Sequence, residues 1–232
     1  MPVKRLQNLI GRHGLWGLVK LIPRYLYTHI ARLSPKAIAA RRRDAEFDRH
    51  YGTDTSRQVS SSELDFDDAA YSDYQVTSHE LGVELLASLD TPLDDYSFVD
   101  FGSGKGRMLL IASRYPFREV IGVELSELLH NIACKNIELY RDPDRRCKNI
   151  QSVPANATEY HVPANKSVYF FYNPFAAEPM QQVADNLARD NAENLAGSFL
   201  IYVYPEHRTV FDNSPAWEEY RSGEEFVIYR GY

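Results

Sequence analysis

The chain has 232 residues, of which 44% are hydrophobic and 25% are charged, a composition that is ordinary for a soluble globular protein. Its two cysteines lack metal-ligand spacing and its seven histidines form no His-x-x-x-His pair, which excludes a disulfide framework and argues against a metal site. The net charge of −6 hides an asymmetry, because residues 1–43 hold ten basic and no acidic residues, which leaves a net charge of −16 on residues 44–232.

The first 43 residues are basic and apolar, and they predict a helical extension. Apolar residues, including Trp16, alternate with basic ones as far as Pro23, and a second run ends at Arg41–Arg43. No apolar run approaches the roughly 18 residues that span a bilayer. Four functions stay open: packing on the rest of the chain or a second copy, lying on an anionic membrane surface, binding nucleic acid, and organellar targeting. The acidity of residues 44–232 disfavours nucleic acid.

Residues 44–70 are expected to connect this extension to the main domain. The segment Phe47–Thr55 and the polar stretch that follows as far as Asp68 are poor in core-forming residues. They predict a loop, which is either a plain linker or a mobile cover over a binding site.

The most informative stretch is Phe98–Arg107, which predicts a strand, a tight turn and the start of a helix. Its glycines are Gly102, Gly104 and Gly106. Glycines tolerate positive φ and let a ligand approach the backbone, while Asp100 offers an acceptor for an ammonium or hydroxyl group. The spacing does not fit a dinucleotide-binding fingerprint, which requires glycine at Arg107. It does not fit a phosphate loop either, because Lys105 is followed by glycine.

A second buried-strand pattern, Glu119–Glu124, ends in an acidic residue eighteen positions beyond Gly106. A doubly wound sheet places such a carboxylate against ribose hydroxyls. Ser126 can then cap a helix that runs to about Tyr140. The residues expected to face inward on that helix are Leu128, Leu129, Ile132, Ala133 and Leu139.

Three more buried-strand patterns and a hairpin complete the alternation of strands and helices. They are Asn149–Val153, Ser167–Tyr172, Ser198–Tyr204 and the hairpin Trp217–Arg230. The pattern predicts an α/β fold with a doubly wound, mostly parallel sheet.

The pattern Asp-x-Gly-x-Gly-x-Gly, with an acid at the end of the next strand, resembles the first two motifs of class I S-adenosylmethionine-dependent methyltransferases. The resemblance covers about residues 71–232 and implies a seven-strand sheet whose last strand is antiparallel. It also implies that S-adenosylmethionine is the cofactor and that Glu124 binds its ribose. The other residues that this implies for the cofactor turn are Asp100, Gly102, Ser103, Gly104 and Gly106.

Three further residues match cofactor-binding positions of this family, each with an alternative structural role. Asn156, in an Asn-Ala pair after the third strand, matches a residue that meets the adenine amino group, but it is equally a turn residue. Tyr74 and Thr77 resemble a Tyr-x-x-(Thr/Ser) segment that borders the methionine end of the cofactor. Thr77 and Glu80 also have capping-box spacing, and we favour helix capping for Thr77.

The tripeptide Asn173, Pro174 and Phe175 directly follows the fourth strand, where it would face the ligand crevice of such a sheet. It resembles the (Asn/Asp)-Pro-Pro-(Tyr/Phe) motif of amino-methylating enzymes, with one proline missing. The resemblance implies that Asn173 holds the target nitrogen and that Phe175 packs against the target. The alternative is an ordinary strand-ending turn.

The leading hypothesis is therefore a cytoplasmic methyltransferase that acts on nitrogen, with a protein side chain such as lysine favoured over nucleic acid or a small amine. An acidic domain would attract a basic protein acceptor. Peripheral membrane contact or self-association through residues 1–43 stays open. The alternative hypothesis is a non-catalytic S-adenosylmethionine-binding module that residues 1–43 dock to a membrane or partner. A nicotinamide-linked oxidoreductase is a third reading.

Overall fold

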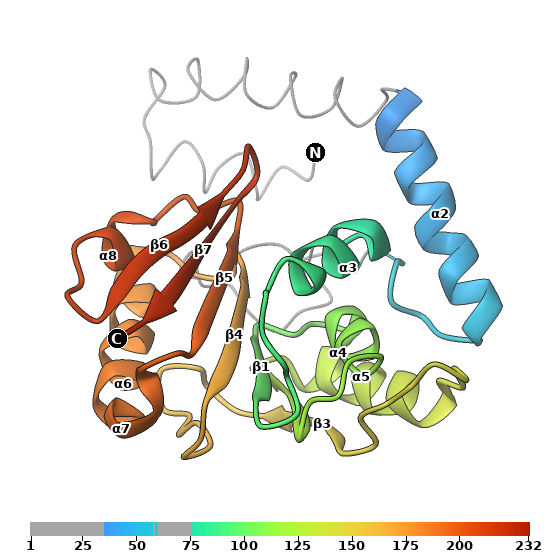
Figure 1. Cartoon of the computed structure of the whole chain (residues 1–232). Helices are drawn as coiled ribbons and strands as arrows, with labels where there is room; N and C mark the ends of the chain where they lie inside the picture. The colour runs from blue at the N-terminus through green and yellow to red at the C-terminus, as the bar shows by residue number, and fades with distance from the viewer. Residues whose placement is uncertain (1–34, 58, 60–75) are drawn as a thin grey trace. The chain divides into compact units, whose positions relative to one another are not determined.

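The computed structural model describes residues 35–57, 59 and 76–232 (Figure 1). The chain divides into two compact units, Met1–Arg43 and Asp44–Tyr232, and the second unit carries the sheet. Most of the predicted basic extension, and Tyr74 with it, lies outside the described residues.

Helices and strands alternate along the described part of the chain, and α2 begins in the first unit and ends in the second. The helices are α2 (Pro35–Tyr51), α3 (His79–Ala87), α4 (Arg107–Ala112), α5 (Glu127–Leu139), α6 (Ala177–Asp190), α7 (Ala192–Leu195) and α8 (Thr209–Asp212). The strands are β1 (Ser97–Phe101), β2 (Glu119–Glu124), β3 (Ile150–Pro154), β4 (Ser167–Tyr172), β5 (Phe199–Val203), β6 (Trp217–Ser222) and β7 (Phe226–Gly231).

The seven strands form one sheet in the order β3-β2-β1-β4-β5-β7-β6. Strands β1 to β5 are parallel to one another, and β7 is inserted antiparallel between β5 and β6. The strand order reverses between β1 and β4, which makes this pair the switch point where open α/β sheets bind ligands. The predicted fold class is confirmed.

Alternating side chains of the strands form a core on each face of the sheet. On one face, Phe98 and Phe170 pack with side chains of α3 and α4, and on the other Phe101 and Phe171 pack with α6. Figure 1 shows α3, α4 and α5 on one side of the sheet and α6 to α8 on the other. Both faces are thus covered, which explains why β1 and β4 are nearly continuous apolar runs.

Three local expectations are wrong. The loop expected from Phe47 is helical as far as Tyr51, because the ring of Phe47 is buried against Leu110 and Tyr140. The cap of α3 is Ser78, whose hydroxyl accepts a hydrogen bond from the backbone N–H of Leu81 at 3.2 Å, so Thr77 is not the cap.

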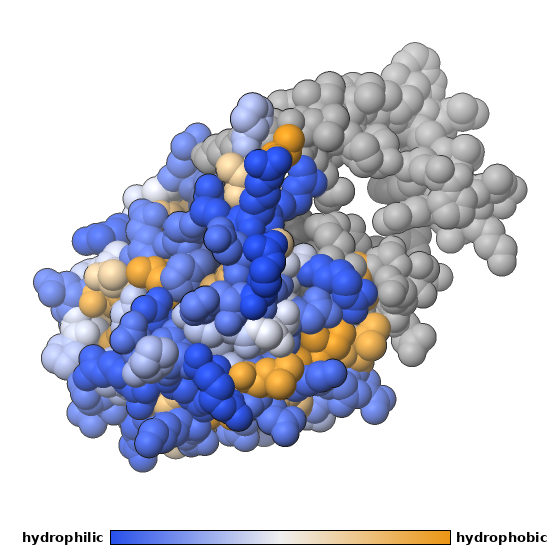
Figure 2. All heavy atoms as spheres, turned by 90° about the vertical axis from the view of Figure 1, so that its right-hand side faces the viewer, coloured by the Kyte–Doolittle hydropathy of each residue, from blue (hydrophilic) through white to orange (hydrophobic). Residues whose placement is uncertain are grey.

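On α5, Leu128 and Leu139 are each 42% exposed and do not face inward. Asn136 is buried on this helix instead, where its amide binds backbone groups of other segments. The face seen in Figure 2 is mainly hydrophilic, with small hydrophobic patches. Among the described residues, no helix is both long and apolar enough to cross a membrane.

Candidate functional site

The glycine turn between β1 and α4 has the conformation that its sequence predicts. The φ angles of Gly102, Gly104 and Gly106 are 77°, 54° and 83°, in the left-handed region that side chains disfavour. The backbone N–H groups of Gly102 and Ser103 both donate to the carbonyl oxygen of Val123, at 2.9 and 3.2 Å. The turn is therefore fastened to the end of β2.

Glu124, the last residue of β2, lies against this turn. Its carboxylate accepts hydrogen bonds from the backbone N–H of Gly104 at 2.7 Å and of Ser126 at 2.8 Å, and a third from Leu125. Burial raises the pKa of Glu124, and these backbone donors counteract the rise. A carboxylate has about four acceptor positions, so one remains for an additional donor such as a hydroxyl group.

Asp100, in β1 beside β2, is a buried carboxyl group to which no hydrogen bond is donated by the described residues. Burial raises its pKa well above the usual range, and the nearby charge of Glu124 raises it further. Uncompensated carboxyl groups of this kind are typical of functional sites, because a ligand supplies the missing partner. Asp100 can therefore receive an ammonium or hydroxyl group from a ligand.

The turn packs so closely on β2 that larger side chains would not fit. A Cβ atom added to Gly122 would lie 2.5 Å from the hydroxyl oxygen of Ser103. That oxygen is buried and has no hydrogen-bond partner in the part of the chain that the structure describes. The tight turn, the free acceptor position on Glu124 and the unpartnered Asp100 form a polar cradle that fits the small polar cofactor the sequence implies.

The tripeptide after β4 meets the glycine turn directly. A Cβ atom added to Gly102 would lie 2.8 Å from Cβ of Pro174, so only glycine fits there. Because β1 and β4 are the strands on either side of the switch point, this contact lies where the crevice of the sheet opens. The two predicted motifs, far apart in the sequence, therefore lie side by side in the structure.

Hydrogen bonds on both sides hold the side-chain amide of Asn173. Its oxygen accepts from the hydroxyl group of Tyr202 at 3.1 Å, and its nitrogen donates to the carboxylate of Glu206 at 3.3 Å. Burial raises the pKa of Tyr202 to about 12, so its hydroxyl stays protonated and remains a donor at neutral pH. The amide oxygen keeps one lone pair for another donor.

Asn173 and Tyr204 are the two non-glycine residues with positive φ in the described part of the chain, at 42° and 48°. Each costs about 1–2 kcal/mol relative to ordinary backbone, and such strain collects at functional sites. The two residues follow the adjacent strands β4 and β5. The ring of Tyr204 is 40% exposed and packs edge-on against Tyr172, with 5.4 Å between ring centroids.

Phe175 does not take the position that the resemblance implies. It is only 5% exposed and packs in the hydrophobic core with residues such as Phe171 and Met180. Tyr204, which directly follows the next strand, is an exposed aromatic residue among those that the structure describes here. The sequence rule that ligands bind at the carboxyl ends of strands could have identified Tyr204, but the prediction did not apply it to the end of β5.

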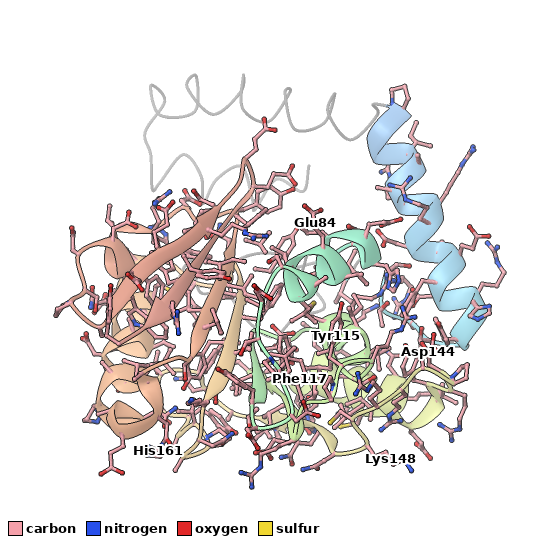
Figure 3. All side chains as sticks on the ribbon, in the orientation of Figure 1. Glu84, Tyr115, Phe117, Asp144, Lys148 and His161 are labelled. Atoms are coloured by element: carbon pink, nitrogen blue, oxygen red, sulfur yellow. The ribbon has the colours of Figure 1, made fainter. Side chains whose placement is uncertain are left out.

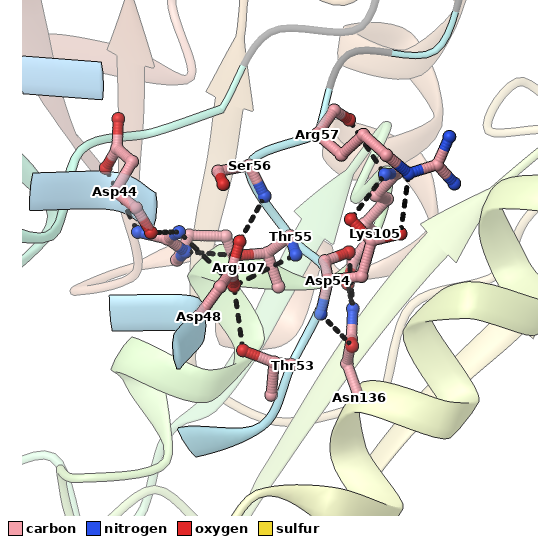
Figure 4. Close-up of polar contacts among 10 residues, drawn as sticks. All are labelled: Asp44, Asp48, Thr53, Asp54, Thr55, Ser56, Arg57, Lys105, Arg107 and Asn136. Carbon is pink, nitrogen blue, oxygen red and sulfur yellow. Dashed lines mark hydrogen bonds and ion pairs between the residues drawn. The ribbon is translucent and has the colours of Figure 1, made fainter. Parts of the chain in front are cut away.

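The ammonium group of Lys105, in the turn, binds residues of the segment Asp44–Arg57 (Figure 4). Its buried ammonium group lies 3.1 Å from the carboxylate of Asp54 and donates to the carbonyl oxygen of Arg57 at 2.7 Å. Asn136 of α5 joins the same cluster by donating to the carbonyl oxygens of Asp54 and Lys105. This explains why the turn carries a lysine without being a phosphate loop.

Arg107, the first residue of α4, fixes the other end of the same segment. Its guanidinium group is buried, lies 3.1 Å from the carboxylate of Asp44 and stacks on the ring of Phe47, 4.1 Å from the centroid. The hydroxyl oxygen of Thr55 lies 2.5 Å from Nε of Arg107, and the carboxylate of Asp48 lies 3.6 Å from Nη2. We call residues Asp44–Arg57 the clamp, because two buried cations of the turn region hold them in place.

The remaining predicted residues are placed as follows. The side-chain oxygen of Asn156 accepts from the backbone N–H of Thr158 at 3.1 Å and from its hydroxyl at 2.9 Å, the arrangement of a turn residue. Asn156 is next to Ala155, whose N–H donates to the carbonyl oxygen of Glu124 at 3.0 Å. Thr77 is buried before α3. Binding of a cofactor by Thr77 and Asn156 stays a prediction.

No protein-family model matches the chain, and no curated protein matches it. Among solved structures, a putative methyltransferase from Escherichia coli, yhhF, is 18% identical, with a TM-score of 0.52 over 68% of this chain and 87% of that chain. An S-adenosylmethionine-dependent methyltransferase from Aquifex aeolicus is 14% identical, with a TM-score of 0.50 over 64% of this chain and 88% of that chain. The chain has the class I methyltransferase fold.

Proposed function

We propose that this protein is an S-adenosylmethionine-dependent methyltransferase that methylates a nitrogen atom, with lysine side chains of a basic protein as the favoured acceptor. The contact between Gly102 and Pro174 carries the proposal, because it joins the turn that resembles a cofactor site to the tripeptide that resembles an acceptor site. Two solved structures with this fold are described as methyltransferases, which supports the assignment.

The cradle of Asp100, Glu124 and the glycine turn would hold the cofactor. When bound, S-adenosylmethionine supplies a methyl group on a positively charged sulfur. The methyl group is therefore already activated, and the protein needs no nucleophilic residue to form a covalent intermediate. Asp100 suits the cofactor's ammonium group and Glu124 suits its ribose hydroxyls. The protein then has to align the acceptor and exclude water.

Asn173 is the residue that we assign to acceptor alignment. The lysine ammonium has to release one proton to water first, because only the neutral amine has a lone pair that can attack the methyl group. One N–H group of that neutral amine can then donate to the lone pair of the amide oxygen that Tyr202 leaves free, which orients the nitrogen lone pair. The exposed ring of Tyr204 adds a surface that stabilises the positive charge developing on a methylated amine.

The charges around this edge favour a cationic acceptor. The carboxylate of Glu206 lies against Asn173, and that of Glu225 is hydrogen-bonded to Tyr204. The net charge of −16 on residues 44–232 attracts a basic protein over longer distances.

The test is transfer of a tritiated methyl group from S-adenosylmethionine to three acceptors: a lysine-rich peptide, the same peptide acetylated on its lysines, and an RNA. We expect labelling of the unmodified peptide only. Asn173→Ala should lower the rate by about 100-fold, as loss of one aligned donor or acceptor does in other sites. Gln181→Ala, which removes an exposed amide on α6, is the matched control and should leave the rate unchanged.

Labelling of the RNA alone would contradict the lysine acceptor and leave methyl transfer standing. Cofactor binding whose affinity Asn173→Ala leaves unchanged, with no acceptor labelled, would favour a non-catalytic binding module.

A further inference from the structure

A hollow with a volume of about 510 Å³ lies at the amino ends of the strands, whereas the glycine turn lies at their carboxyl ends. It is formed by the segment between α4 and β2 and by the segment between α5 and β3, both of which lead into the amino ends of strands. Figure 3 labels one lining residue from each segment, Tyr115 and Asp144. Its arginines are Arg114, Arg145 and Arg146.

The three arginines differ in their ion pairs. The guanidinium group of Arg114 lies 3.0 Å from the carboxylate of Asp144 and 3.5 Å from that of Asp142. Arg145 donates only to backbone carbonyl oxygens, those of Cys147 at 3.0 Å and Lys148 at 3.1 Å. Within the described ranges, no acidic side chain pairs with Arg145 or Arg146. Three arginines therefore face two carboxylates, which leaves a net charge of +1 around the hollow on a unit whose net charge is strongly negative.

The wall of the hollow is rigid before any ligand binds. The backbone N–H groups of Arg146 and Cys147 both donate to the carbonyl oxygen of Ser113 at 2.9 Å, which ties the two segments together. Asp142, at the start of the loop, accepts hydrogen bonds from the hydroxyl groups of Tyr51 and Tyr140. Because the loop and the guanidinium plane of Arg145 are already fixed, a ligand would lose little binding energy to ordering them.

We propose that this hollow binds a small phosphate ester. A guanidinium group has five N–H donors in a planar fork that matches phosphate oxygens, and Arg145 uses only two of them on carbonyl groups. Tyr115 and Pro143 add an apolar wall for the organic part of the ester. The volume lies within the range of about 300–1,000 Å³ for small-molecule sites. The acidity of the unit disfavours a long polyanion such as RNA.

The probes are uridine monophosphate, uridine, inorganic phosphate and a uridine homopolymer, titrated calorimetrically into the full chain at low salt. S-adenosylhomocysteine is kept at saturation so that the methyltransferase crevice does not take up the probes. We expect saturable binding of the monophosphate, weaker binding of inorganic phosphate and none of uridine. The double variant Arg145→Gln/Arg146→Gln should weaken binding at least tenfold at an unchanged melting temperature.

Arg221→Gln/Arg230→Gln is the matched control, since it removes the same charge from exposed positions on β6 and β7 and should bind as the unaltered chain does. No saturable binding of the monophosphate, equal binding by the hollow variant, or binding of the homopolymer alone would each overturn the proposal. None of these results depends on methyl transfer, so the two proposals fail separately.

Discussion

Asp100 and Glu124 are buried carboxyl groups on neighbouring strands, and the fold treats them differently. Backbone donors compensate part of the burial of Glu124, whose pKa is still raised, whereas no described residue donates a hydrogen bond to Asp100. We therefore assign Glu124 mainly to the stability of the turn and Asp100 to ligand binding. Glu124 supports the turn whether or not a ligand is present, while an ionised Asp100 destabilises the empty protein and is compensated only when a cationic group binds.

This difference gives a pH-dependent prediction for Asp100→Asn. Because the folded-state pKa of Asp100 is raised above its unfolded value, the unfolded chain ionises first as the pH rises, and Asp100 lowers stability progressively from about pH 4 upward. Without the cofactor, we expect Asp100→Asn to raise the melting temperature at pH 7–8 and to have no effect near pH 3. The same variant should bind S-adenosylmethionine about 10- to 100-fold more weakly, because a charged hydrogen bond is lost. An equal effect on melting at both pH values would contradict this explanation.

At the scale of elements, residues of the clamp pack against the glycine turn and bury its two cationic side chains. Lys105 and Arg107 flank the last glycine of the turn, and both are buried against residues of Asp44–Arg57. The pKa of Lys105 is lowered by burial, and the nearby Asp54 counteracts the shift. The turn is thus held from two directions, by β2 on one side and by the clamp on the other.

We expect the relative stability of two variants to show that Lys105 carries a buried charge that Asp54 of the clamp compensates. Asp54→Ala leaves the ammonium group of Lys105 buried with less compensation and should cost about 1–3 kcal/mol of unfolding free energy. Lys105→Met removes the charge and keeps most of the volume, so it should cost less. Urea denaturation of both variants measures the order, and a Lys105→Met variant clearly less stable than Asp54→Ala would contradict the assignment.

Sequence reasoning succeeded where a local pattern determines the structure. The strand that contains Asp100 and the glycine alternation that follows it specify the backbone by themselves, and all three glycines have the positive φ that they imply. It failed where distant segments decide. Phe47 lies in a polar stretch of the sequence but is buried because Arg107, Leu110 and Tyr140 pack against it. Phe175 is buried because it joins the core that covers one face of the sheet.

For the molecule as a whole, charge and topology are the features from which we propose an acceptor site at one end of the sheet. The reversal of strand order places the glycine turn and Asn173 at one crevice, and the negative charge of residues 44–232 favours cationic partners for it. The opposite end carries the arginine hollow. The two proposed sites therefore lie at opposite ends of one sheet and differ in chemistry.

The most direct test of this account is calorimetric titration of S-adenosylmethionine into the unaltered chain, Gly102→Ala and Gly52→Ala. Both glycines have positive φ, 77° and 70°, so both substitutions strain the backbone. Only at Gly102 would the new Cβ meet a neighbour, Pro174 at 2.8 Å, whereas nothing lies within 4 Å at Gly52. We expect micromolar binding by the unaltered chain and by Gly52→Ala, and at least tenfold weaker binding by Gly102→Ala. Absence of binding by the unaltered chain, or equal binding by all three, would contradict the proposed site.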